Sequence, residues 1–121
     1  MTKARGTRAA RLLTLAAVVV LVLSLAGPAQ AGSVTIRGRS QRWHPHSVTI
    51  TAGTRVIWRA VDTTHTVTAY RGNWSKDTTV AAGSTTSFTF RNSGTYKFRC
   101  TIHSSIVNGH CEGMCGKVVV T

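Results

Sequence analysis

Residues 94–103 read GTYKFRCTIH, and the fold class that we expect follows from their pattern. Tyr96, Phe98 and Cys100 alternate with polar or charged residues, which is the period of a β-strand with one buried face. We therefore expect a strand that ends near Cys100 and places its thiol on the core face. His103 follows after two intervening residues, in what we expect to be a loop.

The same alternation continues on both sides of this stretch. Short runs rich in Val, Thr, Ile and aromatic residues occur at 33–37, 48–51, 55–59, 65–70, 87–91 and 117–120. Such runs, separated by Gly-rich turns, are typical of an all-β sandwich or barrel, and none beyond residue 31 has a helical period. The segment 70–85 is the least regular, and we expect it to be a connection.

The first thirty-one residues have the pattern of a secretory signal peptide. A basic start with Lys3, Arg5, Arg8 and Arg11 precedes an uncharged apolar run over 12–26, and Ala29-Gln30-Ala31 is a small-x-small cleavage site. A membrane anchor is the alternative, but the run is shorter than the about 20 residues of a spanning helix. We expect export to the periplasm or the cell exterior, with membrane association only if the signal is retained.

The charge of the chain is strongly basic. It has 121 residues, 15 Lys+Arg against 3 Asp+Glu, and a formal net charge of +12. The basic residues after position 31 are scattered along strands, so we do not expect nucleic-acid binding. With Asp62, Asp77 and Glu112 as the only acids and without evident catalytic partners, we do not expect an independent enzyme.

Four side chains carry the chemistry of the chain: His65, Cys100, His103 and Met114. One thiolate, two imidazoles and one thioether form a mixed soft and borderline ligand set, which suits copper in both oxidation states. Zinc would also accept such ligands, but without redox use. The total of three cysteines is odd, so at least one thiol stays outside any intramolecular bridge.

The order of several motifs resembles the cupredoxins, the small blue copper proteins of the plastocyanin, amicyanin and pseudoazurin type. The matching segments are 43–50 (WHPHSVTI), 52–58 (AGTRVIW), 62–67 (DTTHTV), 94–103 (GTYKFRCTIH) and 114–120 (MCGKVVV). The resemblance covers nearly all of residues 32–121, which we expect to form one copper-binding domain. It implies an eight-stranded Greek-key β-sandwich and single-electron transfer.

The resemblance also implies the ligands of one type 1 copper ion. His65, Cys100 and His103 would be the equatorial ligands, and Met114 the axial one, with His110 as a rival for the axial place. The family often has Asn directly after its first His, and here Thr66 stands there. We expect the Thr66 hydroxyl to brace the ligand loop.

A second departure is the ten-residue segment between His103 and Met114, which is longer than in plastocyanin-like proteins. It contains Cys111, and we infer a disulfide between Cys111 and Cys115, because a tight turn would bring residues four apart within bridging distance. Such a bridge would stiffen the enlarged loop and leave Cys100 as the free thiolate.

Two other functions stay open at this point. Cys100, His103, Cys111 and Cys115 would suit a structural Cys₃His zinc site or a disulfide-stapled module, and a copper storage or delivery protein would use the same ligands as a carrier. For the carrier we expect a monomer that meets acidic redox proteins. The contact would lie at His103, within an apolar patch of Ile102, Ile106 and Val107.

Overall fold

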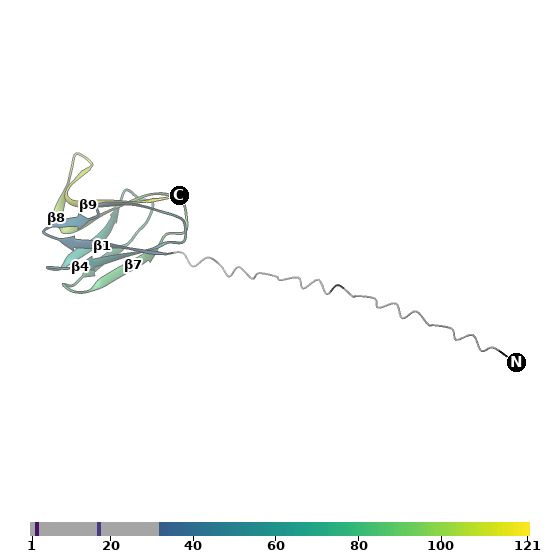
Figure 1. The fold of residues 1–121 in the computed structure, drawn as a ribbon. Helices are drawn as coiled ribbons and strands as arrows, with labels where there is room; N and C mark the ends of the chain where they lie inside the picture. The colour runs from purple at the N-terminus through teal and green to yellow at the C-terminus, as the bar shows by residue number, and fades with distance from the viewer. Residues whose placement is uncertain (1, 3–16, 18–31) are drawn as a thin grey trace.

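The computed structural model describes residues 2, 17 and 32–121 of the chain. The expected signal peptide over 1–31 lies outside the described residues, apart from those two isolated positions. No helix within the described part is long and apolar enough to cross a membrane. From residue 32 onward the regular structure consists of β-strands in two facing layers (Figure 1).

The first layer is a four-stranded sheet. It contains β1 (Ser33–Arg39), β2 (Arg42–His44), β4 (Arg55–Ala60) and β7 (Thr85–Thr89). Their order is β2-β1-β4-β7, with β1 and β4 parallel and the other neighbours antiparallel. Along β4 the side chains of Val56 and Trp58 are buried while those of Arg55 and Arg59 are exposed, as the alternation predicts.

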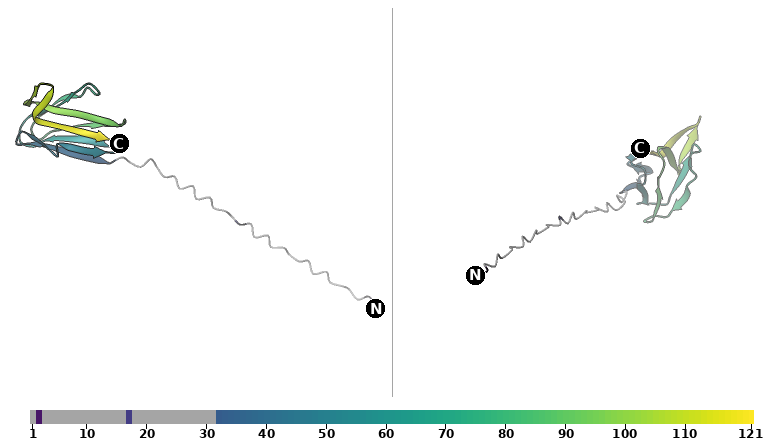
Figure 2. Two further views of the ribbon diagram at one scale, coloured as in Figure 1. Left: turned by 90° about the horizontal axis from the view of Figure 1, so that it is seen from above. Right: turned by 90° about the vertical axis from the view of Figure 1, so that its right-hand side faces the viewer.

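The second layer is a five-stranded sheet that carries most of the candidate ligands. It contains β3 (Ser47–Ile50), β5 (His65–Tyr70), β6 (Asp77–Val80), β8 (Gly94–Val107) and β9 (His110–Val120). Their order is β3-β9-β8-β5-β6, with β3 and β9 parallel. Figure 2 shows the two layers from two further directions. The predicted all-β sandwich is confirmed, with nine described strands in place of about eight.

The core lies between the two sheets and is built from apolar side chains of both. The largest wholly buried members of this cluster include Trp58, Phe90, Phe98, Ile36 and Met114. Trp58 packs edge-to-face on Phe98, with ring centroids 5.3 Å apart, and so joins β4 of one sheet to β8 of the other. Tyr96, Phe98 and Cys100 all face this core, as the alternation along residues 94–103 predicts.

Two local predictions from the sequence are wrong. The segment 70–85, expected to be a connection, contains the edge strand β6, whose four residues Asp77–Val80 pair with β5. The segment after Cys100 is not a loop, because β8 continues to Val107 and pairs with β9 up to His110. This β8–β9 hairpin protrudes beyond the other strands (Figure 1).

The turn of this hairpin has a recognisable sequence signal. Asn108 and Gly109 both have positive φ, 49° and 76°, which is the backbone of the two-residue turns that Asn-Gly favours. The side chain of Arg71, which follows β5, donates to the carbonyl of Gly109 and holds the tip of the hairpin. The predicted ten-residue loop is therefore an ordered extension of the sheet.

Candidate metal centre

Cys100 is the buried thiol at the centre of the site. Its side chain has no exposed surface, and it is the free cysteine of the described residues. Because it lies on β8 in register with the core face, its position follows from the same alternation that buries Tyr96 and Phe98.

A bulge in β8 brings His103 to the same side as Cys100. Arg99 pairs with Cys115 and Ser104 pairs with Gly113, so four residues of β8 lie opposite Met114 alone. Such bulges re-aim side chains next to functional sites. Gly113 makes this arrangement possible, since its φ is +98° and a Cβ there would collide with the backbone carbonyl of His103.

His65 comes from the neighbouring strand. It is the first residue of β5 and is wholly buried. Its Nδ1 lies 3.2 Å from Nδ1 of His103 and 3.9 Å from Sγ of Cys100, while Nδ1 of His103 lies 3.5 Å from that sulfur. His65 is 35 residues before Cys100 and 38 before His103, yet the three ligand atoms form one compact triangle.

The size of this triangle matches a metal ion. A point equidistant from the three atoms lies about 2.1 Å from each, close to the usual metal–nitrogen distance of about 2.0–2.1 Å and metal–sulfur distance of about 2.3 Å. Among the described residues, His65, Cys100 and His103 are the one cluster of three His, Cys, Asp or Glu side chains placed closely enough to bind a metal ion. Two imidazoles and one thiolate in trigonal arrangement suit copper.

Thr66 contacts the sulfur through its backbone and the next strand through its hydroxyl. Its N–H donates to Sγ of Cys100 at 3.3 Å, and its Oγ1 accepts from the N–H of Thr101 at 2.8 Å. This contact holds the sulfur of Cys100 against the start of β5. The bond from the Thr101 N–H ties β5 to β8 directly after Cys100.

Asp62 is a site residue that sequence reasoning missed. Its Oδ1 lies 3.0 Å from Nε2 of His65, and its Oδ2 accepts from the N–H of Ser40 at 2.6 Å. A carboxylate only accepts, so Nε2 carries the proton and the lone pair of His65 is left on Nδ1, toward Cys100. The Ser40 N–H and then His65 lower the pKa of Asp62 to about 2. The signal was its spacing, three residues before His65.

Met114 lies next to the triangle, on the inner side of β9. Its side chain is wholly buried. Met114 Cε and His65 Cδ2 each lie 2.9 Å from the position that a Cβ on Gly38 would occupy, so both pack over the same bare backbone. His110, the rival for a fourth ligand, is exposed and pairs with Val107 at the end of the hairpin.

Cys111 and Cys115 form a disulfide that brackets Met114, as expected from the sequence. Their Cα atoms are 6.1 Å apart although both belong to β9, because the strand bends at Gly113. The bridge occupies two of the thiols that a Cys₃His zinc site would need. The Cys₃His zinc hypothesis is therefore wrong for this structure. The third side chain beside Cys100 and His103 is His65 and not a cysteine.

Comparison with known proteins identifies the fold. The family model described as Cupredoxin-like domain matches residues 12–111. No curated protein sequence matches the chain. Among solved structures, amicyanin from Paracoccus versutus is 24% identical, with a TM-score of 0.59 over 79% of this chain and 86% of that one.

Two further structures have the same architecture. The oxidised state of a proline-to-alanine variant of amicyanin is 23% identical, with a TM-score of 0.63, over 74% of this chain and 83% of the other. A copper-containing nitrite reductase from Thermus scotoductus is 22% identical, with a TM-score of 0.61, over 74% of this chain but only 22% of that longer one. At these identities the likeness concerns the fold.

Proposed function

The chain belongs to the family of cupredoxin-like domains, and we propose that it is an exported type 1 copper protein that carries single electrons between redox proteins. The observation that supports this function best is the convergence of Nδ1 of His65, Nδ1 of His103 and Sγ of Cys100 into one triangle. When bound there, copper supplies reversible one-electron exchange between Cu(II) and Cu(I).

The residues around the triangle would keep the ligands in one arrangement during that exchange. His65 is held by Asp62 from behind, and Cys100 is wholly buried and accepts the N–H of Thr66. Met114, on β9, would offer its thioether as a weak fourth ligand. Because these groups are fixed by the fold, little reorganisation would accompany a change of charge at the site.

His103 is the ligand through which we expect electrons to pass. It is half-buried, whereas His65 and Cys100 have no exposed surface, so among these three ligands only His103 is exposed to solvent. The neighbouring side chains of Ile102, Ile106 and Val107 are 55%, 44% and 41% exposed. Apolar side chains exposed on the same strand as this ligand suit the small, short-lived contacts of electron carriers.

Export is supported by two independent features. The N-terminal pattern over residues 1–31 is that of a secretory signal, and a Cys111–Cys115 disulfide is typical of oxidising compartments outside the cytosol. We propose that the domain acts in the periplasm or outside the cell, as a monomer and without catalysis of its own. Because the fold also resembles part of a larger nitrite reductase, the absence of catalysis can be tested with nitrite as a substrate.

The experiment that tests this function is a copper titration followed by visible absorption. Addition of one equivalent of Cu(II) should produce an intense thiolate-to-copper charge-transfer band, which ascorbate bleaches and a mild oxidant restores. A colourless copper complex would rule out the type 1 site. Fast exchange between oxidised and reduced samples would support a carrier, whereas slow exchange with tightly held Cu(I) would favour storage or delivery.

A further inference from the structure

Two lysines face each other on the outer surface of the five-stranded sheet. Lys97 of β8 is directly opposite Lys117 of β9, and Tyr70 of β5 pairs with Lys97 on its other side. Like charges directly opposite each other destabilise a sheet. Within residues 32–121 neither lysine has an ion-pair partner. Their repulsion lowers the stability of the fold, so a role other than folding is needed to explain the pair.

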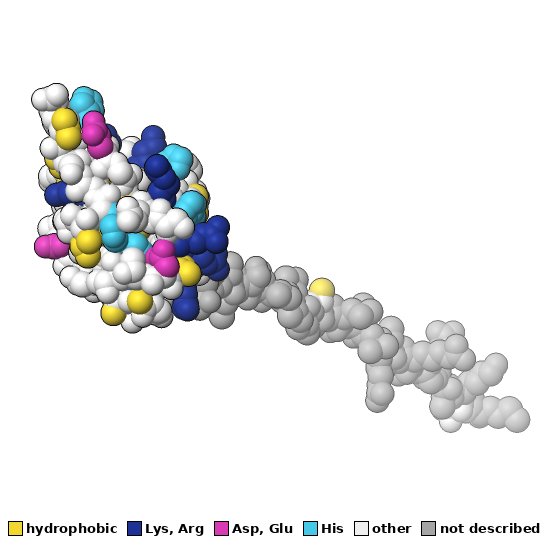
Figure 3. All heavy atoms as spheres, turned by 90° about the vertical axis from the view of Figure 1, so that its left-hand side faces the viewer, with side chains coloured by type: hydrophobic (Ala, Val, Ile, Leu, Met, Phe, Trp, Pro, Cys, Tyr) yellow, Lys and Arg dark blue, Asp and Glu magenta, His cyan; other side chains and the backbone are white. Residues whose placement is uncertain are grey.

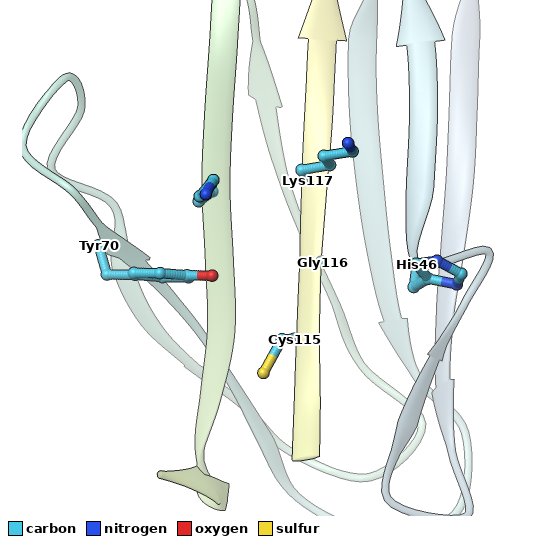
Figure 4. A pocket seen from close by; sticks show the side chains of 6 residues that line it. His46, Tyr70, Cys115, Gly116 and Lys117 are labelled. Carbon is cyan, nitrogen blue, oxygen red and sulfur yellow. The ribbon is translucent and has the colours of Figure 1, made fainter. Parts of the chain in front are cut away.

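These lysines line a shallow cavity of about 290 Å³. Figure 4 shows Lys117 and Cys115 on β9, with Tyr70 entering from one side and His46 from the other. Arg99, opposite Cys115 in the sheet, lies close enough to Tyr70 to influence its hydroxyl, whose pKa is raised mainly by burial and lowered in part by Arg71 and Arg99. The floor of the cavity therefore combines cations with a hydroxyl.

A second cavity continues the first toward β2. It shares His46 and Cys115 with the first and adds Arg42 and His44. We call the two together the basic cleft. Figure 3 shows Lys, Arg and His side chains close together along one side of the molecule, with the acidic side chains scattered.

No carboxylate lines the basic cleft. Of the three acids in the sequence, Asp62 is engaged by His65 and Ser40, and Asp77 accepts from Thr68 at the far edge of the sheet. Glu112 lies on the protruding hairpin, opposite Ser105. The cations of the basic cleft are thus left without neutralisation by this chain.

The basic cleft lies on the reverse side of the strands that hold the candidate ligands. Arg99 points outward directly before Cys100, which points inward. Gly113 and Cys115 line the second cavity and flank Met114, whose side chain is buried on the other face. A molecule seated in the basic cleft would be separated from the candidate metal centre by one layer of strand.

We propose that the basic cleft docks a carboxylate-rich surface of the protein that exchanges electrons with this one through His103. Gly113, which lines the second cavity, lies against the backbone carbonyl of His103, so the cleft borders the segment that carries this ligand. Lysine ammonium groups are compact point charges that pair with carboxylates without demanding one orientation, which suits a brief contact. The aromatic rings that line the cleft are half-buried (Tyr70) or buried (Trp43), and its cations form no long stripe. Binding of single-stranded nucleic acid would need a basic groove with exposed rings on which bases stack. The role as a partner site rests on the proposed function, whereas the anion binding itself does not.

The test uses the Cu(I) form of the protein, an oligoglutamate peptide as probe, and amide chemical shifts by NMR. At low ionic strength the peptide should shift the amides of Lys97, Cys115 and Lys117, and the shifts should weaken at about 0.15 M salt. The double variant Lys97→Glu/Lys117→Glu should weaken binding about tenfold. The matched control Arg55→Glu/Arg59→Glu, which makes the same charge change on exposed positions of β4, should change it less than about threefold.

Three results would overturn the proposal. They are shifts that avoid the cleft, an equal loss in the β4 control, and equal binding of a single-stranded DNA of the same charge at the same amides. Failure of the proposed function is separate, because it would appear as a missing charge-transfer band while the peptide still binds. The conservative variant Lys97→Arg/Lys117→Arg should keep the charge-transfer band and should still bind the oligoglutamate peptide.

Discussion

The carboxylate of Asp62 lies 3.0 Å from Nε2 of His65, on the edge of the ring that faces away from Cys100. The same carboxylate accepts the backbone N–H of Ser40, which follows β1 in the other sheet. One side chain therefore joins the first candidate ligand to the opposite layer of the sandwich. This contact sets both the orientation and the tautomer of the imidazole.

Replacing Asp62 should weaken the metal centre without unfolding the domain. Asp62→Ala removes the acceptor behind His65, and loss of such a partner typically lowers metal affinity by about 10–100-fold. Competition with a copper chelator would measure the change. Asp77→Ala is the matched control, since Asp77 accepts from Thr68 at the edge strand β6 and should leave copper affinity unchanged. Equal losses in both variants would contradict a positioning role for Asp62.

The lowered pKa of Asp62 predicts how stability responds to acid. Its pKa is about 2 in the folded protein against an ordinary 3.8, chiefly because of the Ser40 N–H and then His65. Ionised Asp62 therefore favours the folded state at every pH above 3.8, and this contribution is lost as the pH falls through about 2. In urea unfolding of the copper-free protein, the free energy of unfolding should fall less between pH 3.8 and about 2 for Asp62→Asn than for the natural chain.

The three cysteines should behave differently when replaced. Cys100→Ser should abolish the charge-transfer band, because the thiolate is its source. The double variant Cys111→Ser/Cys115→Ser should keep the band and lose about 2 kcal/mol of stability or less, since the bridge closes only a short loop. Visible spectra and urea unfolding of the two proteins would measure this. A band lost in both would point to a shared cysteine site.

Met114 and His110 can be separated by substitution. Met114→Leu keeps the buried volume but removes the thioether, so we expect the blue colour to persist and the reduction potential to rise. Voltammetry of the copper-loaded protein would measure the potential. His110→Ala changes an exposed residue of the hairpin and should leave the potential where it is. The reverse pattern would make His110 the fourth ligand.

Reversing the charge of one of the two opposed lysines should increase the stability of the fold. Lys97→Glu converts a repulsive cross-strand pair with Lys117 into an attractive one, worth about 0.2–1 kcal/mol. Urea unfolding at low ionic strength would measure the gain, and salt should reduce it. Lys97→Gln should give a smaller gain. A loss of stability in both variants would show that Lys97 is needed for folding.

Much of the fold was predictable because alternation is a local property. The two-residue period of Tyr96, Phe98 and Cys100 indicates that their side chains lie on one face of the sheet, whichever strands pair with β8. The extension after Cys100 was missed although Asn108-Gly109 is a strong hairpin signal, because the expectation of a ligand loop outweighed it. The edge strand β6 was missed because a four-residue run carries little periodicity.

The kinds of donor groups and the face on which Cys100 lies follow from side-chain chemistry and backbone period alone, so both could be predicted along the chain. Three other relations arise only on folding: Asp62 lies behind His65, the β8 bulge aims His103 at Cys100, and Lys97 lies opposite Lys117 on the outer face of the sheet. These relations depend on the register between strands distant in sequence. That register is set by how the two sheets pack around one core, which no local pattern encodes.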